Sequence, residues 1–401
     1  MCADTTYGCR WSQAGHSPGW RERSGALDCG QRPITLLEGK EEETGPADPE
    51  RSAAALAETA AAFAACGLYE RAESTARSIA RPGTRSEALT GIAAAAATAG
   101  LDGKASELAR DAEVAARSVV PGVRRTEDLC SAAVALAGAG FPGQAASLAS
   151  KAVGTARLVD DPLWRPFALA RSAWALARAG QQGQAEQLAD EAEVAVALIP
   201  ERRREFYTVW MTAPLAEAGM YGKADGIARS ICHQSPYEGT LVPSYSYQAW
   251  AVAMISAAAA EAGRRATAAR LAAGAATLLQ QAEGDSTFIT NAQAATACAL
   301  AASGLHVRAA SLAASIADNA DRAEAYAKMA EILMESGAHE KAEQFARQAE
   351  TSAREEEDQG SRMEAMAQAA EGLACAGLYE RAETLGSPRG AWRPLHLRTT
   401  C

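Results

Sequence analysis

Histidine, serine and the acidic residues are the side chains best suited to proton transfer and nucleophilic attack, but here they form no catalytic pattern. The chain contains no G-x-x-x-x-G-K-[ST], no strand-bounded G-x-G-x-x-G, no H-E-x-x-H and no G-x-S-x-G. No carboxylate or nucleophile accompanies the histidines at a fixed spacing. The histidines are His16, His233, His306, His339 and His396. We therefore expect a protein that is not an enzyme and that uses no cofactor.

Cysteine could hold a metal ion or form disulfides, and the chain has 9 cysteines. Cys2, Cys9 and Cys29 lie near the N-terminus with His16, but none of them forms a C-x-x-C pair. A zinc site there is the alternative to a tail without structure, and the spacing favours the tail because tetrahedral sites normally show paired short spacings. The cysteines between residues 66 and 375 lie far apart, which favours small buried apolar residues and no metal site.

Aromatic and arginine side chains offer a different chemistry, the binding of a partner. Of the 22 aromatic residues, 11 lie between Trp164 and Trp250. One helical face combines both types at i, i+4, i+7 and i+11, and further rings follow along the chain. The face carries Phe167, Arg171, Trp174 and Arg178, and the later rings are Phe206, Trp210 and Trp250. This composition is typical of interface hot spots, but large rings also fill cores, so binding and packing both remain open.

The elements that position these residues follow from a repeated pair, a glycine with an alanine five residues later. Such self-similarity indicates a stacked array of repeats, in which each unit buries its apolar face only against its neighbours. The intervals between the glycines are 33, 40, 40, 39, 44, 41, 33 and 40 residues. The pairs are Gly67/Ala72, Gly100/Ala105, Gly140/Ala145, Gly180/Ala185, Gly219/Ala224, Gly263/Ala268, Gly304/Ala309, Gly337/Ala342 and Gly377/Ala382.

Each repeat is expected to be two helices joined by a tight turn at the glycine. A small residue precedes the glycine, and a large apolar residue usually stands four residues before it, as at Leu136 and Leu176. Another large apolar residue follows eight residues after it, as at Leu148, where the second helix turns inward. Going from 33 to 40 residues adds about two helical turns, which keeps the buried face in phase. No run alternates apolar and polar residues, so we expect no sheet.

The segment "GLYERAE", which occurs at Gly67 and again at Gly377, resembles the turn of tetratricopeptide (TPR) repeats, with Ala72 and Ala382 at the packing alanine. The resemblance covers about Glu50 to Leu385, in an alanine-rich form of bacterial type. It implies an all-α, right-handed α-solenoid of about nine TPR-like hairpins. It also places the residue thirteen before each glycine on the concave side. These residues are Ala54, Glu87, Glu127, Phe167, Phe206, Trp250, Asn291, Glu324 and Glu364.

The two ends of the chain differ from the repeats. Residues 1–49 lack helical periodicity and end in an acidic linker, so we expect a disordered tail. Residues 386–401 form an irregular tail with three arginines and no acidic residue. The ninth second helix changes composition abruptly at Gly386. This change favours the hypothesis that the chain is a shortened or frame-altered form of a longer array.

Charge and hydropathy exclude further classes of function. The net charge is -10, which argues against nucleic acid as a partner because phosphate binding needs a basic surface. No long apolar stretch and no signal peptide are present, so we expect no membrane contact and a cytoplasmic location. We therefore expect a scaffold that binds a peptide or protein segment in its concave groove. The alternative is a ligand-sensing or regulatory arm of a signalling ATPase or transcription regulator, separated from its output domain.

Overall fold

The computed structural model describes residues 49–120, 122–138, 140–234, 241–282 and 286–385, which contain 18 α-helices and two short strands. The two tails, residues 1–48 and 386–401, lie outside the described residues, as do the N-terminal cysteines and His16. The first helices of the hairpins are α1 (Pro49–Ala65), α3 (Pro82–Thr98), α5 (Val123–Gly138), α7 (Arg165–Arg178), α9 (Glu201–Glu217), α11 (Tyr245–Glu261), α13 (Ser286–Ala302), α15 (Asn319–Glu335) and α17 (Gln359–Cys375). The second helices are α2 (Tyr69–Ser78), α4 (Asp102–Arg117), α6 (Pro142–Arg157), α8 (Gln182–Val196), α10 (Tyr221–Arg229), α12 (Arg265–Leu279), α14 (His306–Ala314), α16 (His339–Glu355) and α18 (Tyr379–Leu385).

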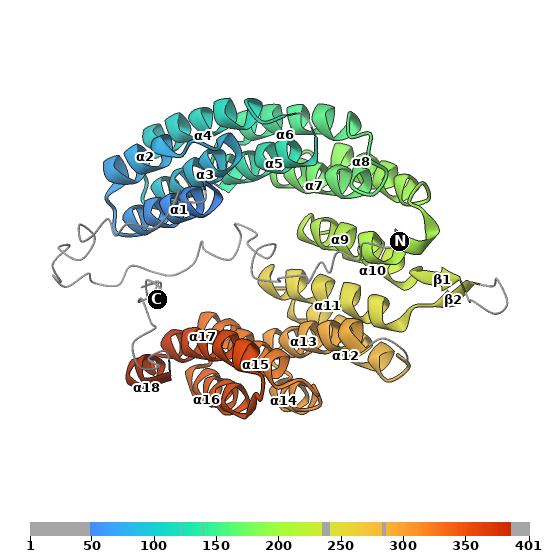
Figure 1. Cartoon of the computed structure of the whole chain (residues 1–401). Coiled ribbons are helices and arrows are strands. Elements are labelled where there is room, and N and C mark those ends of the chain that lie inside the picture. Colours follow the sequence, from blue (N-terminus) through green and yellow to red (C-terminus); the bar gives the residue numbers. More distant parts are fainter. Residues whose placement is uncertain (1–48, 121, 139, 235–240, 283–285, 386–401) are drawn as a thin grey trace, which may run out of the picture.

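The helices stack as a two-layered array. Each first helix packs against its own second helix and against the first helix of the next repeat. Figure 1 shows the array as an arc, with the first helices along its inner side and the second helices along its outer side, most clearly from α1 to α8. The fold is therefore all-α and solenoidal. Its first helices form a continuous inner layer.

Every first helix ends in the same backbone turn. The nine turn glycines all have positive φ, between 70 and 81°. At Gly180 the glycine amide donates to the carbonyl of Ala177, and the next amide, of Gln181, donates to the carbonyl of Leu176. This pair of bonds defines the Schellman motif, which requires a residue that tolerates the left-handed conformation. The large apolar residue four positions before the glycine is thus the residue whose carbonyl closes the turn.

The alanine five residues after each glycine lies in the first turn of the second helix. Its amide donates to the carbonyl of the residue that follows the glycine, as Ala185 does to Gln181. All nine alanines are buried, and eight of them are completely inaccessible to solvent. The apolar residue eight after the glycine is also buried in most repeats, for example Leu148 and Phe345. The predicted frame is therefore confirmed on both sides of the turn.

A recurring arginine joins one repeat to the next. Arg85, in the first turn of α3, donates from Nη1 to the carbonyl of Ile79, at the end of the preceding second helix. Arg125, Arg204, Arg322 and Arg362 make equivalent bonds. Gln248 takes this role in α11 and donates to the carbonyls of Arg229 and Ile231. These side chains satisfy carbonyls that a helix C-terminus leaves without an intrahelical partner.

The repeats differ mainly in the length of the second helix. The two intervals of 33 residues contain α2 and α14, with 10 and 9 residues, whereas α4 and α16 have 16 and 17. The extra residues lengthen the outer helix by about two turns without disturbing the turn, as expected. None of the described helices combines the length and the apolar character needed to cross a membrane.

The expectation that the chain forms no sheet was wrong at one place. Strands β1 (Cys232–Gln234) and β2 (Leu241–Pro243) pair antiparallel between α10 and α11, with His233 opposite Val242. They occupy the longest interval between turn glycines. Three residues are too few to show an alternating pattern, which explains why the sequence did not indicate them.

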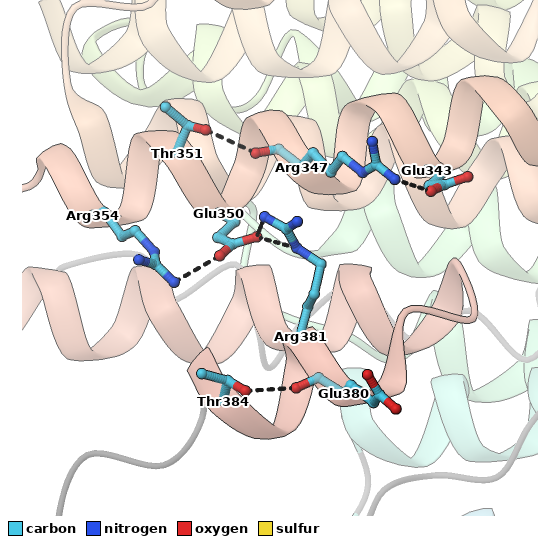
Figure 2. Close-up of polar contacts among 8 residues, drawn as sticks. All are labelled: Glu343, Arg347, Glu350, Thr351, Arg354, Glu380, Arg381 and Thr384. Carbon is cyan, nitrogen blue, oxygen red and sulfur yellow. Dashed lines mark hydrogen bonds and ion pairs between the residues drawn. The ribbon is translucent and has the colours of Figure 1, made fainter.

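Ion pairs connect neighbouring helices of the outer layer, and one of them joins the last described helix, α18, to α16. Glu350 on α16 accepts two bonds from Arg381 on α18, at 2.7 and 2.9 Å, and one from Arg354 at 2.7 Å (Figure 2). The Glu350 side chain is only 7 % exposed. A buried carboxylate needs such partners. Similar pairs between neighbouring second helices join Lys104 to Glu73 and Lys151 to Glu113.

Two glycines near the junction of α7 and α8 test whether the positive φ of the turn glycine contributes to stability. Gly180 lies in the turn itself, and Gly183 lies in the first turn of α8. No atom lies within 4 Å of a Cβ added at Gly180 or at Gly183, but only Gly180 has positive φ. We expect Gly180→Ala to lower the free energy of unfolding by about 1–2 kcal/mol because an L-residue is strained there. Gly183→Ala, in the first turn of α8, should leave stability unchanged or raise it by up to about 1 kcal/mol. Urea unfolding followed by circular dichroism compares them, and equal effects would contradict the assignment.

Candidate binding face on the inner helices

The candidate site lies on one face of the first helices, which form the inner layer of the array. We define the inner face as the residues thirteen, nine, six and two positions before each turn glycine, a spacing that places them on one side of a helix. In α7 they are Phe167, Arg171, Trp174 and Arg178; in α9 Phe206, Trp210, Ala213 and Glu217; in α11 Trp250, Met254, Ala257 and Glu261. These three helices are consecutive in the inner layer (Figure 1). All seven predicted site residues occupy these positions, and the structure brings Phe206, Trp210 and Trp250 into ring contact and Arg171 onto Trp174.

Four rings of this face and two beside it, Trp164 and Tyr207, form a continuous aromatic cluster; the four are Phe167, Phe206, Trp210 and Trp250. Trp164 and Tyr207 join α7 to α9 with ring centroids 5.1 Å apart, and Trp210 and Trp250 join α9 to α11 at 5.9 Å. Both contacts are edge-to-face. Such pairs are worth about 0.5–1.5 kcal/mol beyond the area they bury. The cluster therefore stabilises the stacking of three repeats.

The rings differ in exposure, and this corrects one expectation. An open groove requires all of the rings to be partly exposed. Trp174 and Trp250 are instead buried, with exposed fractions of 4 % and 2 %. Trp250 is covered by Phe206 and Trp210 of the preceding repeat, and the Arg171 guanidinium lies over the Trp174 ring. Phe167, Phe206 and Trp210 are half-buried, so the accessible part of the surface is narrower than expected.

Arg171 is fixed between aromatic and acidic groups. Its guanidinium carbon lies 4.2 Å from the centre of the Trp174 ring, a cation–π contact. Its Nη1 lies 3.6 Å from the carboxylate of Glu217 on the next inner helix. Arg171 is 9 % exposed, whereas Arg178 reaches solvent. Arg171 therefore belongs to the packing between repeats, and Arg178 is exposed at the end of this helix.

The sequence did not single out all members of the surface. Trp164 and Tyr207 belong to the aromatic cluster, and Tyr247 packs against Phe288 with ring centroids 4.7 Å apart. Trp164, Tyr247 and Phe288 share one position in the repeat, sixteen residues before the turn glycine. That shared position is the signal that could have identified them.

Carboxyl groups are crowded at the other inner positions. Burial raises the pKa of Glu127, and the nearby charges of Arg171 and Arg124 oppose that rise. Burial also raises the pKa of Asp128 to about 7. One oxygen of Asp128 lies 3.6 Å from Nε of Arg124, and the other has no hydrogen-bond partner. The inner layer therefore holds carboxyl groups whose charge is poorly compensated.

The remaining reactive side chains form no site within the described residues. Cys66 is exposed, contrary to the expectation of a buried residue, Cys130 is buried, and the other three cysteines are intermediate. Burial raises the pKa of the Cys130 thiol to about 12, so it is unreactive as a nucleophile. No three His, Cys, Asp or Glu side chains of the described ranges lie close enough together to hold a metal ion.

Comparison with known proteins identifies no family for this chain. No family model and no curated protein matches the chain. A solved structure, that of Ton1535 from Thermococcus onnurineus NA1, aligns with 82 % of this chain and 94 % of its own, at 14 % identity and a TM-score of 0.40. A similarity of this size carries no functional argument.

Trp250 and Trp210 differ in burial, and this difference should appear as a difference in how much each ring contributes to stability. We expect Trp250→Ala to cost about 3–5 kcal/mol of unfolding free energy, because removal of a fully buried ring leaves a cavity. Trp210→Ala should cost clearly less, since part of that ring already contacts water. Urea unfolding of both variants gives the comparison, and equal losses would show that Trp210 is core as well.

The raised pKa of Asp128 predicts how stability depends on pH. In an unfolded chain an aspartate titrates near pH ~4. Between that value and about pH 7 the folded protein therefore holds a proton that the unfolded chain has lost, so the free energy of unfolding falls as the pH rises through this window. Asp128→Asn should raise the urea midpoint at pH 8 and flatten the fall between pH 5 and 8. The exposed Asp160→Asn is the control. Parallel pH curves for Asp128→Asn and the unchanged protein would contradict the assignment.

Proposed function

We propose that this chain is a TPR-like, non-enzymatic interaction scaffold of the cytoplasm, which binds an extended peptide or protein segment along its inner face. The observation that supports the proposal is the row of half-buried rings on consecutive inner helices, Phe167 on α7 and Phe206 and Trp210 on α9. Aromatic residues held in a rigid setting contribute most to binding, because they lose little side-chain entropy.

The geometry of the repeat supports the TPR-like part of the proposal. A Schellman turn at the glycine and a buried alanine on the following helix recur at all nine hairpins. Because the turn is the same each time, the inner helices present the same positions to a partner. An extended segment could then contact several repeats in succession.

The surface also explains why binding would be specific. Phe206 and Trp210 are supported from below by the buried Trp250, with ring centroids 6.3 and 5.9 Å away. Rings fixed in this way keep their orientation in the free protein. A partner would therefore meet a preformed surface, which lowers the entropic cost of binding.

The test is a binding measurement in which stability is followed in parallel. Random peptides are panned on the immobilised protein, and fluorescence anisotropy then gives the Kd of each recovered peptide. Phe206→Ala with Trp210→Ala should weaken binding by about 30-fold or more, as expected for hot-spot residues. Phe141→Ala is the matched control, since Phe141 is equally half-buried but lies in the turn before α6.

Unfolding curves of the double variant show whether a loss of peptide binding is caused by a loss of folded protein. If the double variant keeps most of its stability and loses the peptides, the inner face is the binding site. Recovery of peptides that bind the double variant and the unchanged protein equally well would refute the proposal. So would a library that yields no binder to the folded protein.

A further inference from the structure

The outer layer has a gap wherever an internal second helix is short. Helices α2, α10 and α14 have 10, 9 and 9 residues, whereas α4, α6, α8, α12 and α16 have 15 to 17. The difference corresponds to nearly two helical turns, or about 10 Å of helix. Each short helix therefore leaves the far end of the next second helix without its usual neighbour.

An arginine ten residues after the turn glycine fills two of these three gaps. In α2 it is Arg77, which forms an ion pair with Asp111 of α4. In α10 it is Arg229, whose Nη2 lies 3.2 Å from the point where a Cβ on Gly274 of α12 would stand. In α14 the same position holds Ala314, the last residue of the helix. Its methyl group is too short to reach across the third gap.

A pocket of about 220 Å³ opens in the third gap, between α14, α15 and α16. It is lined by Ala314, Arg322, Tyr326, Gln348, Thr351 and Ser352. The corresponding positions of the first gap hold, in the same order, Arg77, Arg85, Leu89, Asp111, Val114 and Ala115. Three apolar residues and a carboxylate of the first gap are thus replaced here by neutral polar side chains. The third gap is both more open and more polar.

Among the lining residues, Gln348 has a buried polar atom without a partner. Its Oε1 makes no hydrogen bond within the described residues. At the same position of other second helices, eleven residues after the turn glycine, Asp111, Lys151 and Glu191 all pair with the preceding second helix. Rotation about the last torsion of Gln348 exchanges its oxygen and its amide nitrogen, so either can be turned into the pocket. A partner supplied from outside would satisfy this amide.

The other walls of the pocket favour a neutral, flat ligand. Arg322 already donates to the hydroxyl of Ser352 and to the carboxylate of Glu355, both at 3.2 Å, so its charge is compensated. The ring of Tyr326 stacks on that of Phe345, with centroids 5.9 Å apart, and forms a rigid apolar wall. An anion would find no uncompensated cation in these walls, and a cation no carboxylate among the lining residues.

We propose that the pocket between α14 and α16 binds a small neutral amide with a flat apolar body. The carboxamide of the ligand pairs with that of Gln348 through N–H···O bonds, and the flat body lies against the ring of Tyr326. None of the lining residues belongs to the inner face, so the inference is independent of the proposed scaffold.

The experiment uses three probes of similar shape, namely benzamide, benzoate and benzamidine, which are neutral, negative and positive. Saturation-transfer NMR titrations with the full chain give a Kd for each probe. We expect benzamide to bind at least about ten-fold tighter than the other two, because a charged probe loses hydration without finding an opposite charge in the pocket.

Variants then locate the contact. Ala314→Arg gives α14 the residue that α2 and α10 carry, so it should keep the urea midpoint and weaken benzamide at least about ten-fold by filling the pocket. Ser150→Arg, at an exposed position of α6, is the matched control for the added charge. Gln348→Leu should also weaken benzamide by about ten-fold, with an unchanged or higher urea midpoint, because it removes an unpartnered buried polar atom.

Each remaining outcome would overturn the inference. Equal Kd values for the three probes would remove the preference for an amide. An equal Kd for benzamide in the unchanged protein and in Ala314→Arg, or an equal loss in Ser150→Arg, would place the binding elsewhere. The absence of saturable benzamide binding would refute the site itself. If Ala314→Arg fails to fold, Gln348→Leu decides the location alone.

Discussion

One backbone constraint underlies the whole array, the left-handed glycine that ends each first helix. Its positive φ allows two consecutive amides to reach carbonyls of the last helical turn, so the chain reverses within a few residues. The reversal brings the alanine five residues later into the crossing between the helices, where it is buried. Because the turn is identical in nine places, every first helix enters the inner layer at the same rotation. This is why a single count back from the glycine finds the inner face in each repeat.

The joints between repeats tolerate more variation than the turns inside them. Second helices range from 7 to 17 residues in the described chain, and one joint contains the small β1–β2 sheet. The arginines that bond to the preceding helix end, such as Arg85 and Arg322, fix the angle at which the next first helix begins. The glycine turn therefore sets the form of each hairpin, and at five joints an arginine bonds the next first helix to the hairpin before it. Variation in length falls mainly on the outer layer, since the first helices have 14 to 17 residues.

The sequence was sufficient for the features that repeat and insufficient for those that occur once. The Gly180/Ala185 pair and its eight equivalents predicted the turns, the buried alanines and the all-α class, because nine copies make a weak signal strong. The β1–β2 pair occurs once and has no alternating pattern. The burial of Trp250 could not be read from its own helix, because the rings that cover it, Phe206 and Trp210, come from the preceding repeat. The joint arginines recur at a fixed position, but their bonds to helix ends are a tertiary feature.

The aromatic rings of this region are of two kinds: some are buried in the core, and others remain partly exposed and are available for binding. Trp250 and Trp174 are core residues by their burial. Phe206 and Trp210 cover Trp250, and the Arg171 guanidinium covers Trp174. Phe206, Trp210 and Phe167 keep part of each ring at the surface. The buried rings hold the partly exposed rings in a fixed orientation. A partner can then bind the exposed rings without an entropic cost for ordering them first. Packing in this region therefore supports the proposed binding surface and does not compete with it.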